Sequence, residues 1–138
     1  MKKKSKNYLQ ILGVLMFLAF SAQAIAQEKN SNEWVAPEEA NKVVNPLKGN
    51  AEATKAGKKL YKQQCAICHG DTGKGDGVAG MSLTPKPTNF TLEKVQAETD
   101  GGIFWKLTNG KAPMAAYKDI LTEEQRWQLV NYIRTLSK

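Results

Sequence analysis

The sequence predicts a small all-α domain of three to four helices joined by long connections. Helix-forming residues occupy positions 51–64, with small and apolar residues on one face and lysines on the other. A further helix is expected after Thr122, because Thr122 and Gln125 have the spacing of a capping box and Leu129 and Ile133 then fall on one face. The chain offers no two convincing strands that could pair, so no sheet is expected.

The first 26 of the 138 residues have the pattern of a secretory signal peptide. Lysines open the chain, an apolar run extends from Ile11 to Phe20, and small residues lead to a cleavage site expected after Ala26. A cut after Ala24 and an uncleaved N-terminal anchor remain as alternatives, since a signal and an anchor differ only in degree. The apolar run is short for a membrane span, so no span is expected after cleavage.

The charge of the mature chain is mildly positive. Four of the 20 basic residues and none of the 13 acidic residues lie in the signal segment, which leaves the mature chain with a net charge of +3. Nucleic-acid binding is excluded on this pattern, because it requires clustered Lys and Arg interleaved with stacking aromatics. The remaining length fits one domain.

Residues 27–50 are expected to form a leader to a domain at residues 51–138. Pro37 and Pro46 interrupt any long helix in the leader. Its second half carries too many apolar side chains, such as Val43, for a solvated tail. We therefore expect this half to lie on the surface of the domain.

The middle of the domain combines loops with short helices. Residues 70–90 are rich in glycine and proline and are expected to form a loop, without the spacing of a phosphate-binding or calcium-binding loop. Residues 91–98 predict a short helix. Residues 100–110 suit a strand or a helix, and we expect a helix because no second strand could pair with them.

The only two cysteines and the only histidine of the chain lie together in the segment Cys65-Ala66-Ile67-Cys68-His69. The C-x-x-C-H spacing is associated with covalent attachment of c-type haem, because two cysteines three apart on a helical turn point the same way. Their sulfurs can add to two vinyl groups of one porphyrin, and the histidine can give the iron a nitrogen ligand. Three other uses of the segment fit it less well. A thioredoxin-like redox pair would follow a strand, and a structural zinc site needs four ligands where this segment supplies three. A simple disulfide would leave His69 unexplained.

The chain resembles the class I monohaem cytochromes c of the bacterial periplasmic type. Beyond the C-x-x-C-H motif, the resemblance rests on Gly57 and Tyr61 before the first cysteine, on LVNYI at 129–133, and on the loop segments GDTGKGDG and PKPTNF. It implies the cytochrome c fold, packed around one covalently bound haem that holds an iron. It also implies that Tyr132 packs across Gly57, which allows two helices to cross closely.

Two methionines remain as candidates for the second axial ligand, because the other two leave with the signal peptide and no second histidine exists. Met81 lies in the glycine-rich loop, only 12 residues past the histidine, which is a short tether. Met114 lies just before the last helix, where the family carries its axial methionine, and it is the expected ligand. The family commonly has proline after this methionine, whereas here Ala115 follows and Pro113 precedes.

The surroundings of the iron ligands can also be predicted. The carbonyl of Pro85, or alternatively of Pro87, is expected to accept a hydrogen bond from the free ring nitrogen of His69. Apolar residues from three parts of the domain are expected to wall the haem pocket. These are Ile67, Phe104, Trp105, Leu107, Leu129 and Ile133.

Together with the four porphyrin nitrogens, the histidine and thioether ligands fill all positions of the iron, which favours electron transfer over catalysis. We therefore expect a periplasmic, monomeric electron carrier, not an enzyme, that exchanges electrons with a respiratory complex, an oxidase or a dehydrogenase through small transient interfaces. One alternative is a five-coordinate haem protein that binds a diatomic gas or peroxide, in which Met114 is not a ligand. Another is a cytochrome subunit of an oxidoreductase complex.

Overall fold

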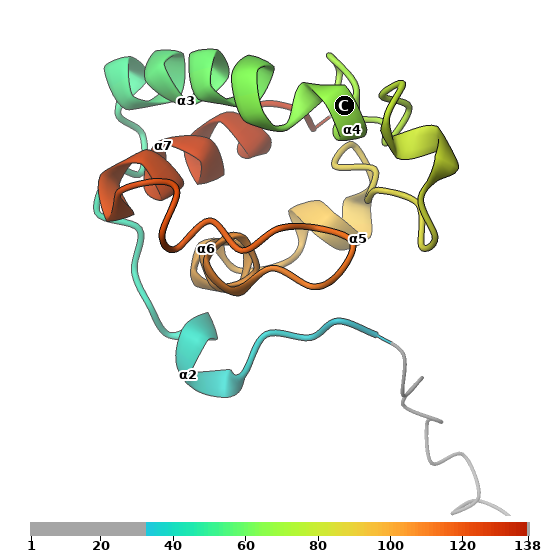
Figure 1. The fold of residues 1–138 in the computed structure, drawn as a ribbon. Coiled ribbons are helices and arrows are strands. Elements are labelled where there is room, and N and C mark those ends of the chain that lie inside the picture. Colours follow the sequence, from blue (N-terminus) through green and yellow to red (C-terminus); the bar gives the residue numbers. More distant parts are fainter. Residues whose placement is uncertain (1–32, 138) are drawn as a thin grey trace, which may run out of the picture. The chain divides into compact units, whose positions relative to one another are not determined.

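The computed structural model describes residues 33–137 and is helical, with no strand in that range (Figure 1). The predicted signal peptide at residues 1–26 lies outside the described residues. Residues 35–137 belong to one compact unit, so the packed part of the chain begins before the predicted domain start at residue 51. Within residues 33–137 no helix has both the length and the apolar character that crossing a bilayer requires.

Three helices of ten or more residues dominate the described chain: α3 (Ala51–Gln64), α6 (Asp100–Asn109) and α7 (Glu123–Arg134). The others have one turn each: α2 (Glu38–Asn41), α4 (Ala66–His69), α5 (Glu93–Gln96) and the 3₁₀ turn η1 (Gly80–Ser82). The predicted all-α fold is confirmed, and its three to four helices correspond to the three long ones.

Local capping explains where the predicted helices begin. Thr122 and Gln125 form the expected capping box, with the Gln125 N–H donating to Thr122 Oγ1 at 3.2 Å and the Thr122 N–H donating to Gln125 Oε1 at 2.9 Å. Residues 100–110 form a helix as expected. Thr99 caps it, since its hydroxyl accepts from the Gly102 N–H at 3.0 Å.

The most extensive contact between helices joins α3 and α7 (Figure 1). A Cβ atom at Gly57 would overlap the backbone carbonyl of Gln128, so a glycine is required for this close crossing. The predicted role of Gly57 is confirmed, but the atoms across it belong to Gln128. Tyr132 lies one turn further along and packs against Tyr61, with ring centroids 5.0 Å apart.

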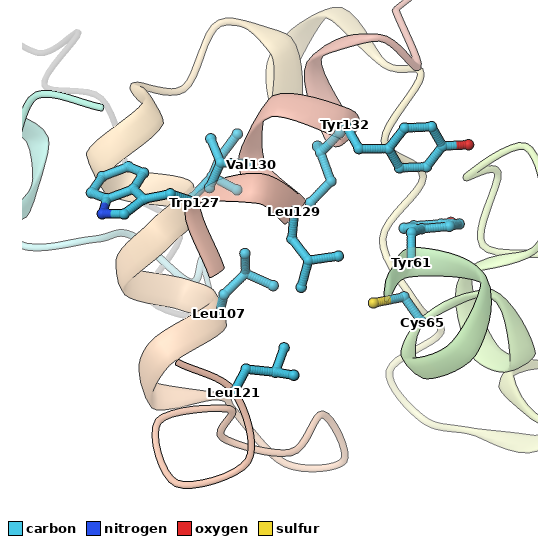
Figure 2. Packing of buried hydrophobic residues seen from close by; sticks show 10 residues of the cluster. Tyr61, Cys65, Leu107, Leu121, Trp127, Leu129, Val130 and Tyr132 are labelled. Atoms are coloured by element: carbon cyan, nitrogen blue, oxygen red, sulfur yellow. The ribbon is translucent and has the colours of Figure 1, made fainter. Parts of the chain in front are cut away.

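The core lies between α3, α6 and α7. Tyr61 and Leu129 are fully buried, and Leu107 of α6 belongs to the same cluster. Figure 2 shows the sulfur of Cys65 pointing from the end of α3 toward Leu129 and Leu121. The interior of the domain therefore reaches the two-cysteine segment.

The second half of the leader packs onto α6, as expected. Ala36 and Ala40 are buried there. A Cβ at Gly101 would overlap the carbonyl oxygen of Ala40, so α2 lies directly against the first turn of α6. Val43 is half exposed beside this contact.

A polar network joins the leader to α6 and α7. Asn45 is buried, and its side-chain amide donates to Asp100 Oδ2 at 3.0 Å and to Asn131 Oδ1 at 2.8 Å. Arg134 Nε donates to Asp100 Oδ1 at 2.7 Å. Desolvation alone would raise the pKa of the Asp100 carboxyl, but the hydrogen bonds from Asn45 and Arg134 and the charge of Arg134 outweigh it and lower the pKa.

Replacing Asp100 with Asn is expected to lower the free energy of unfolding at pH 7 by about 1–3 kcal/mol, because the charge-assisted bonds to Asn45 and Arg134 weaken. The contribution is present above the unfolded-state pKa of about 3.9 and is lost as the pH falls through the lower folded-state pKa. Urea unfolding of both proteins at pH 7 and near pH 3 measures this, and the difference should shrink at the lower pH. Asp119→Asn, at an exposed position, is the control. A difference that does not change with pH contradicts the assignment.

Candidate functional site

The two cysteines lie where α3 passes into α4. Cys65 ends α3, its N–H donating to the Tyr61 carbonyl at 2.9 Å, and the His69 N–H donates to the Cys65 carbonyl at 2.8 Å. Both cysteines are free thiols, with Cys65 buried and Cys68 partly buried. Burial, followed by the nearby charge of Cys68, raises the pKa of the Cys65 thiol to about 12. The helical turn therefore presents two unpaired thiols three positions apart.

His69 is buried at the end of α4, with 9% of its surface exposed. Its ring stacks on Phe90, with centroids 4.4 Å apart and an interplanar angle of 17°. The Nδ1–H donates to the carbonyl oxygen of Thr88 at 3.0 Å, so Nε2 keeps its lone pair. Burial lowers the pKa of the imidazole, while the Thr88 hydrogen bond acts in the opposite direction. The neutral ring that results is the form of histidine that binds metals.

The predicted acceptor for the His69 ring, Pro85, is wrong. Pro85 is exposed, and the alternative, Pro87, directs its carbonyl against Gly75. Thr88 comes next in the chain and supplies the carbonyl. Consecutive carbonyls of a loop point in different directions, and the sequence gives no signal that distinguishes them.

The glycine-rich loop packs on the backbone of α4. The Gly77 N–H donates to the Cys68 carbonyl at 3.1 Å, and the Ala79 N–H donates to the Ile67 carbonyl at 3.0 Å. A Cβ at Gly77 would lie 2.6 Å from the Ala66 oxygen and would overlap the Ile67 oxygen. The loop therefore satisfies carbonyls at the end of α4 that helix geometry leaves without partners.

Tyr61 supports the start of this loop. It is fully buried, and its hydroxyl donates to the Gly70 carbonyl at 2.8 Å. Burial and nearby negative charges, first that of Cys65, raise the pKa of its phenol. The phenol therefore stays protonated and remains a donor next to the histidine.

The two candidate methionines have different environments. Met114 is partly buried and packs against the core cluster that contains Cys65. Its backbone pairs with Lys111 through hydrogen bonds of 2.9 and 3.1 Å, which closes a tight turn. Met81 lies on η1 with 67% of its surface exposed. Of the two methionines, only Met114 borders the core.

The Met114 loop is fastened to the end of α6 and to α3. The Tyr117 N–H donates to the Leu107 carbonyl at 3.0 Å, at the end of α6. The Tyr117 hydroxyl donates to the Gln64 carbonyl at 3.1 Å, at the end of α3. Sequence reasoning missed Tyr117, and only its aromatic character three positions after the methionine could have drawn attention to it.

The expected pocket wall is largely found in the core. Leu107, Leu129 and Ile133 are buried in the central cluster, and Phe104 packs against it. Phe104 also stacks on Trp127, which the sequence analysis missed, with centroids 3.9 Å apart. Trp105 is partly buried outside this cluster. Ile67 lies outside this cluster, and 60% of its surface is exposed: the turn that directs Cys65 inward directs Ile67 outward.

The described thiols and imidazole do not form a metal site by themselves. Among residues 33–137, no three His, Cys, Asp or Glu side chains converge closely enough to hold an ion. The donor set consists of two thiols on one helical turn, one neutral imidazole nitrogen and one thioether near the core. These groups fit covalent attachment and axial ligation of a haem.

A family model described as cytochrome C oxidase, cbb3-type, subunit III matches residues 52–133. A cytochrome c6-like protein of Nostoc sp. is 34% identical over 87 residues, which are 61% of this chain and 71% of the relative. Cytochrome c6 of Rippkaea orientalis is 34% identical over 83 residues, which are 56% of this chain and 66% of the relative. The residues that the family model matches include the two-cysteine segment.

Two solved structures resemble the fold. One is from the reducing HAO-like protein complex of Kuenenia stuttgartiensis, with a TM-score of 0.61 and 29% identity. That match covers 70% of this chain and 50% of the other, so this chain spans half the length of that one. The second is the c-type cytochrome KustC0563, with a TM-score of 0.51, 30% identity, and coverage of 59% of this chain and 98% of that chain.

Replacing Gly77 with Ala is expected to lower the free energy of unfolding by about 1–3 kcal/mol, because the new methyl group would meet the backbone of Ala66 and Ile67. Chemical denaturation of the mature protein measures this. The neighbouring Val78→Ala, at a position 79% exposed, is the control and should change stability by less than about 0.5 kcal/mol. Equal effects of the two substitutions would contradict the close approach of loop and helix.

Proposed function

Because the chain belongs to the cytochrome c family that the cbb3-type subunit III model describes, it is an electron-transfer haem protein with covalently bound haem c, and we propose which side chains hold that haem. Cys65 and Cys68 would attach it, and His69 and Met114 would be the ligands of its iron. The observation that carries this proposal is that Cys65 belongs to the same core cluster against which Met114 packs.

Each proposed residue has a separate task. The thiols of Cys65 and Cys68 would each add their S–H across a vinyl double bond of the porphyrin, and the resulting thioether bonds would fix the group to the turn between α3 and α4. His69 offers Nε2, while its Nδ1–H is held by the Thr88 carbonyl, which fixes the tautomer and strengthens the nitrogen as a ligand. Stacking on Phe90 fixes the plane of the ring.

The haem supplies one-electron transfer at its iron. Met114 contributes a soft thioether sulfur, which favours the ferrous state and raises the reduction potential. The buried side chains around Leu107 and Leu129 exclude water and disfavour the extra charge of the ferric state. If His69 and Met114 both bound the iron, no position would remain for a substrate, which supports a carrier rather than an enzyme.

The partners of this carrier follow from its chemistry. A small single-haem protein exchanges electrons with a respiratory complex, an oxidase or a dehydrogenase through brief contacts. We propose that the protein is a monomer in the periplasm. Residues 1–26 would direct its export as a signal peptide and would be removed by cleavage after Ala26.

A second candidate function is that of a cytochrome subunit within an oxidoreductase complex. The names of the matching family model and of the Kuenenia structure, both of which refer to multi-subunit assemblies, favour this candidate. Gel filtration of the protein purified from its own host distinguishes the two. A free monomer supports the carrier, and an obligate assembly supports the subunit.

Replacing Met114 with Leu is expected to abolish the weak long-wavelength sulfur-to-iron absorption band of the ferric protein and to lower the reduction potential, because the thioether is lost. The reduced variant should also bind carbon monoxide promptly. Met81→Leu, at the exposed methionine, is the matched control and should leave all three properties unchanged. If wild type itself lacks the band and binds carbon monoxide promptly, the five-coordinate gas-binding alternative is correct.

Mass spectrometry of the exported protein is expected to find a chain that begins at Gln27 and carries one haem. In the Cys65→Ala, Cys68→Ala double variant the covalent haem should be lost, because no thiol remains for a thioether bond. Denaturation in alkaline pyridine provides the optical check of the thioether linkage. A coloured wild-type protein whose chain has the mass of the bare polypeptide would disprove attachment.

A further inference from the structure

The loop that carries Met114 leaves α6 and returns to it. The Lys111 and Met114 backbones pair with each other, and the Tyr117 N–H bonds to Leu107 at the end of α6. These bonds hold the base of the loop on α6. They do not connect the loop to the helical segment that carries the two cysteines.

The side chain of Tyr117 makes that connection. Its hydroxyl donates to the Gln64 carbonyl at 3.1 Å, across 53 positions of the chain. Gln64 is the last residue of α3, and its carbonyl is among those that helix geometry leaves without an intrahelical partner. The same peptide group carries the nitrogen of Cys65. One hydrogen bond therefore joins the Met114 loop to the peptide of the first cysteine.

The surroundings of Tyr117 keep it in the protonated form that can donate. The ring is partly buried and packs against the core cluster. Burial, followed by the charges of Cys65 and Cys68, raises the pKa of the phenol. Burial is the largest cause of the raised pKa and remains when the two thiols are converted to thioethers, so the hydroxyl is a donor throughout the neutral range.

We infer that Tyr117 is a positioning residue for Met114, because its hydroxyl fastens the methionine loop to the segment that attaches the haem. The inference rests on the proposed role of Met114 as axial ligand. Surface loops open locally at a lower cost in free energy than the core, and a ligand from solution can take the iron position only when Met114 has moved away. A bond that must break before the loop opens therefore favours the state in which Met114 is bound.

The test is the affinity of the ferric holoprotein for imidazole, which competes with Met114 for the iron. Tyr117→Phe keeps the ring and removes only the hydroxyl. It should raise the imidazole affinity roughly two- to fivefold, as expected for the loss of one hydrogen bond near solvent. The sulfur-to-iron band should also disappear at a lower imidazole concentration. The free energy of unfolding is measured in parallel to show that the variant is folded.

Tyr132→Phe is the matched control. Tyr132 is buried in the same core, and its hydroxyl makes no hydrogen bond among the described residues; its ring packs against that of Tyr61 (Figure 2). An unchanged imidazole affinity in Tyr117→Phe, with or without a loss of stability, overturns the inference, and so does an equal increase in Tyr132→Phe. A wild-type protein without the sulfur-to-iron band overturns the ligand role of Met114 itself, and this inference falls with it.

Discussion

The close crossing of α3 and α7 at Gly57 determines where the functional residues lie. Since no side chain separates the helices there, the backbone at Gln128 lies directly against α3. One turn later, Tyr61 contacts Tyr132 and reaches the Gly70 carbonyl beyond the histidine. The turn from Cys65 to His69 begins immediately after this contact. The packing of α3 against α7 therefore sets the orientation of this turn.

The ends of the helices provide the attachment points for the two functional loops. The last carbonyls of α4 accept from the glycine-rich loop, through Gly77 and Ala79. The last turn of α6 and the end of α3 accept from Tyr117, through its backbone and its hydroxyl respectively. Groups that helix geometry leaves without partners are thus used to hold the segments near the histidine and Met114.

The sequence predicted the features that local or repeated signals encode. A capping box, a helical face and a glycine at a helix crossing are each visible within a few residues, and the structure confirms them at Thr122, along α7 and at Gly57. The C-x-x-C-H motif and the methionine before the last helix identified the candidate site for the same reason. The local pattern of residues 100–110 suits a strand as well as a helix. The absence of a second strand that could pair with them predicts a helix, and the structure confirms it.

The remaining features depend on contacts between distant parts of the chain. Thr88 rather than Pro85 meets His69 because the loop places that one carbonyl at the Nδ1 edge of the ring. Ile67 is exposed because the turn that buries Cys65 directs it outward. The hydroxyl of Tyr117 finds its acceptor 53 residues away, and no short-range pattern marks such a pair.

The packing of the leader on α6 determines which piece of this chain could serve as a transferable module. Ala40 covers Gly101, and Asn45 supplies partners for both Asp100 and Asn131. A fusion protein or crystallisation fragment that starts at Ala51, where the sequence resemblance begins, would uncover a helix surface. It would also remove both Asn45 and Leu47, the hydrogen-bond partners of the buried Asn131 side chain, and would leave Asp100 with Arg134 alone. The module that can be grafted intact starts at Val35.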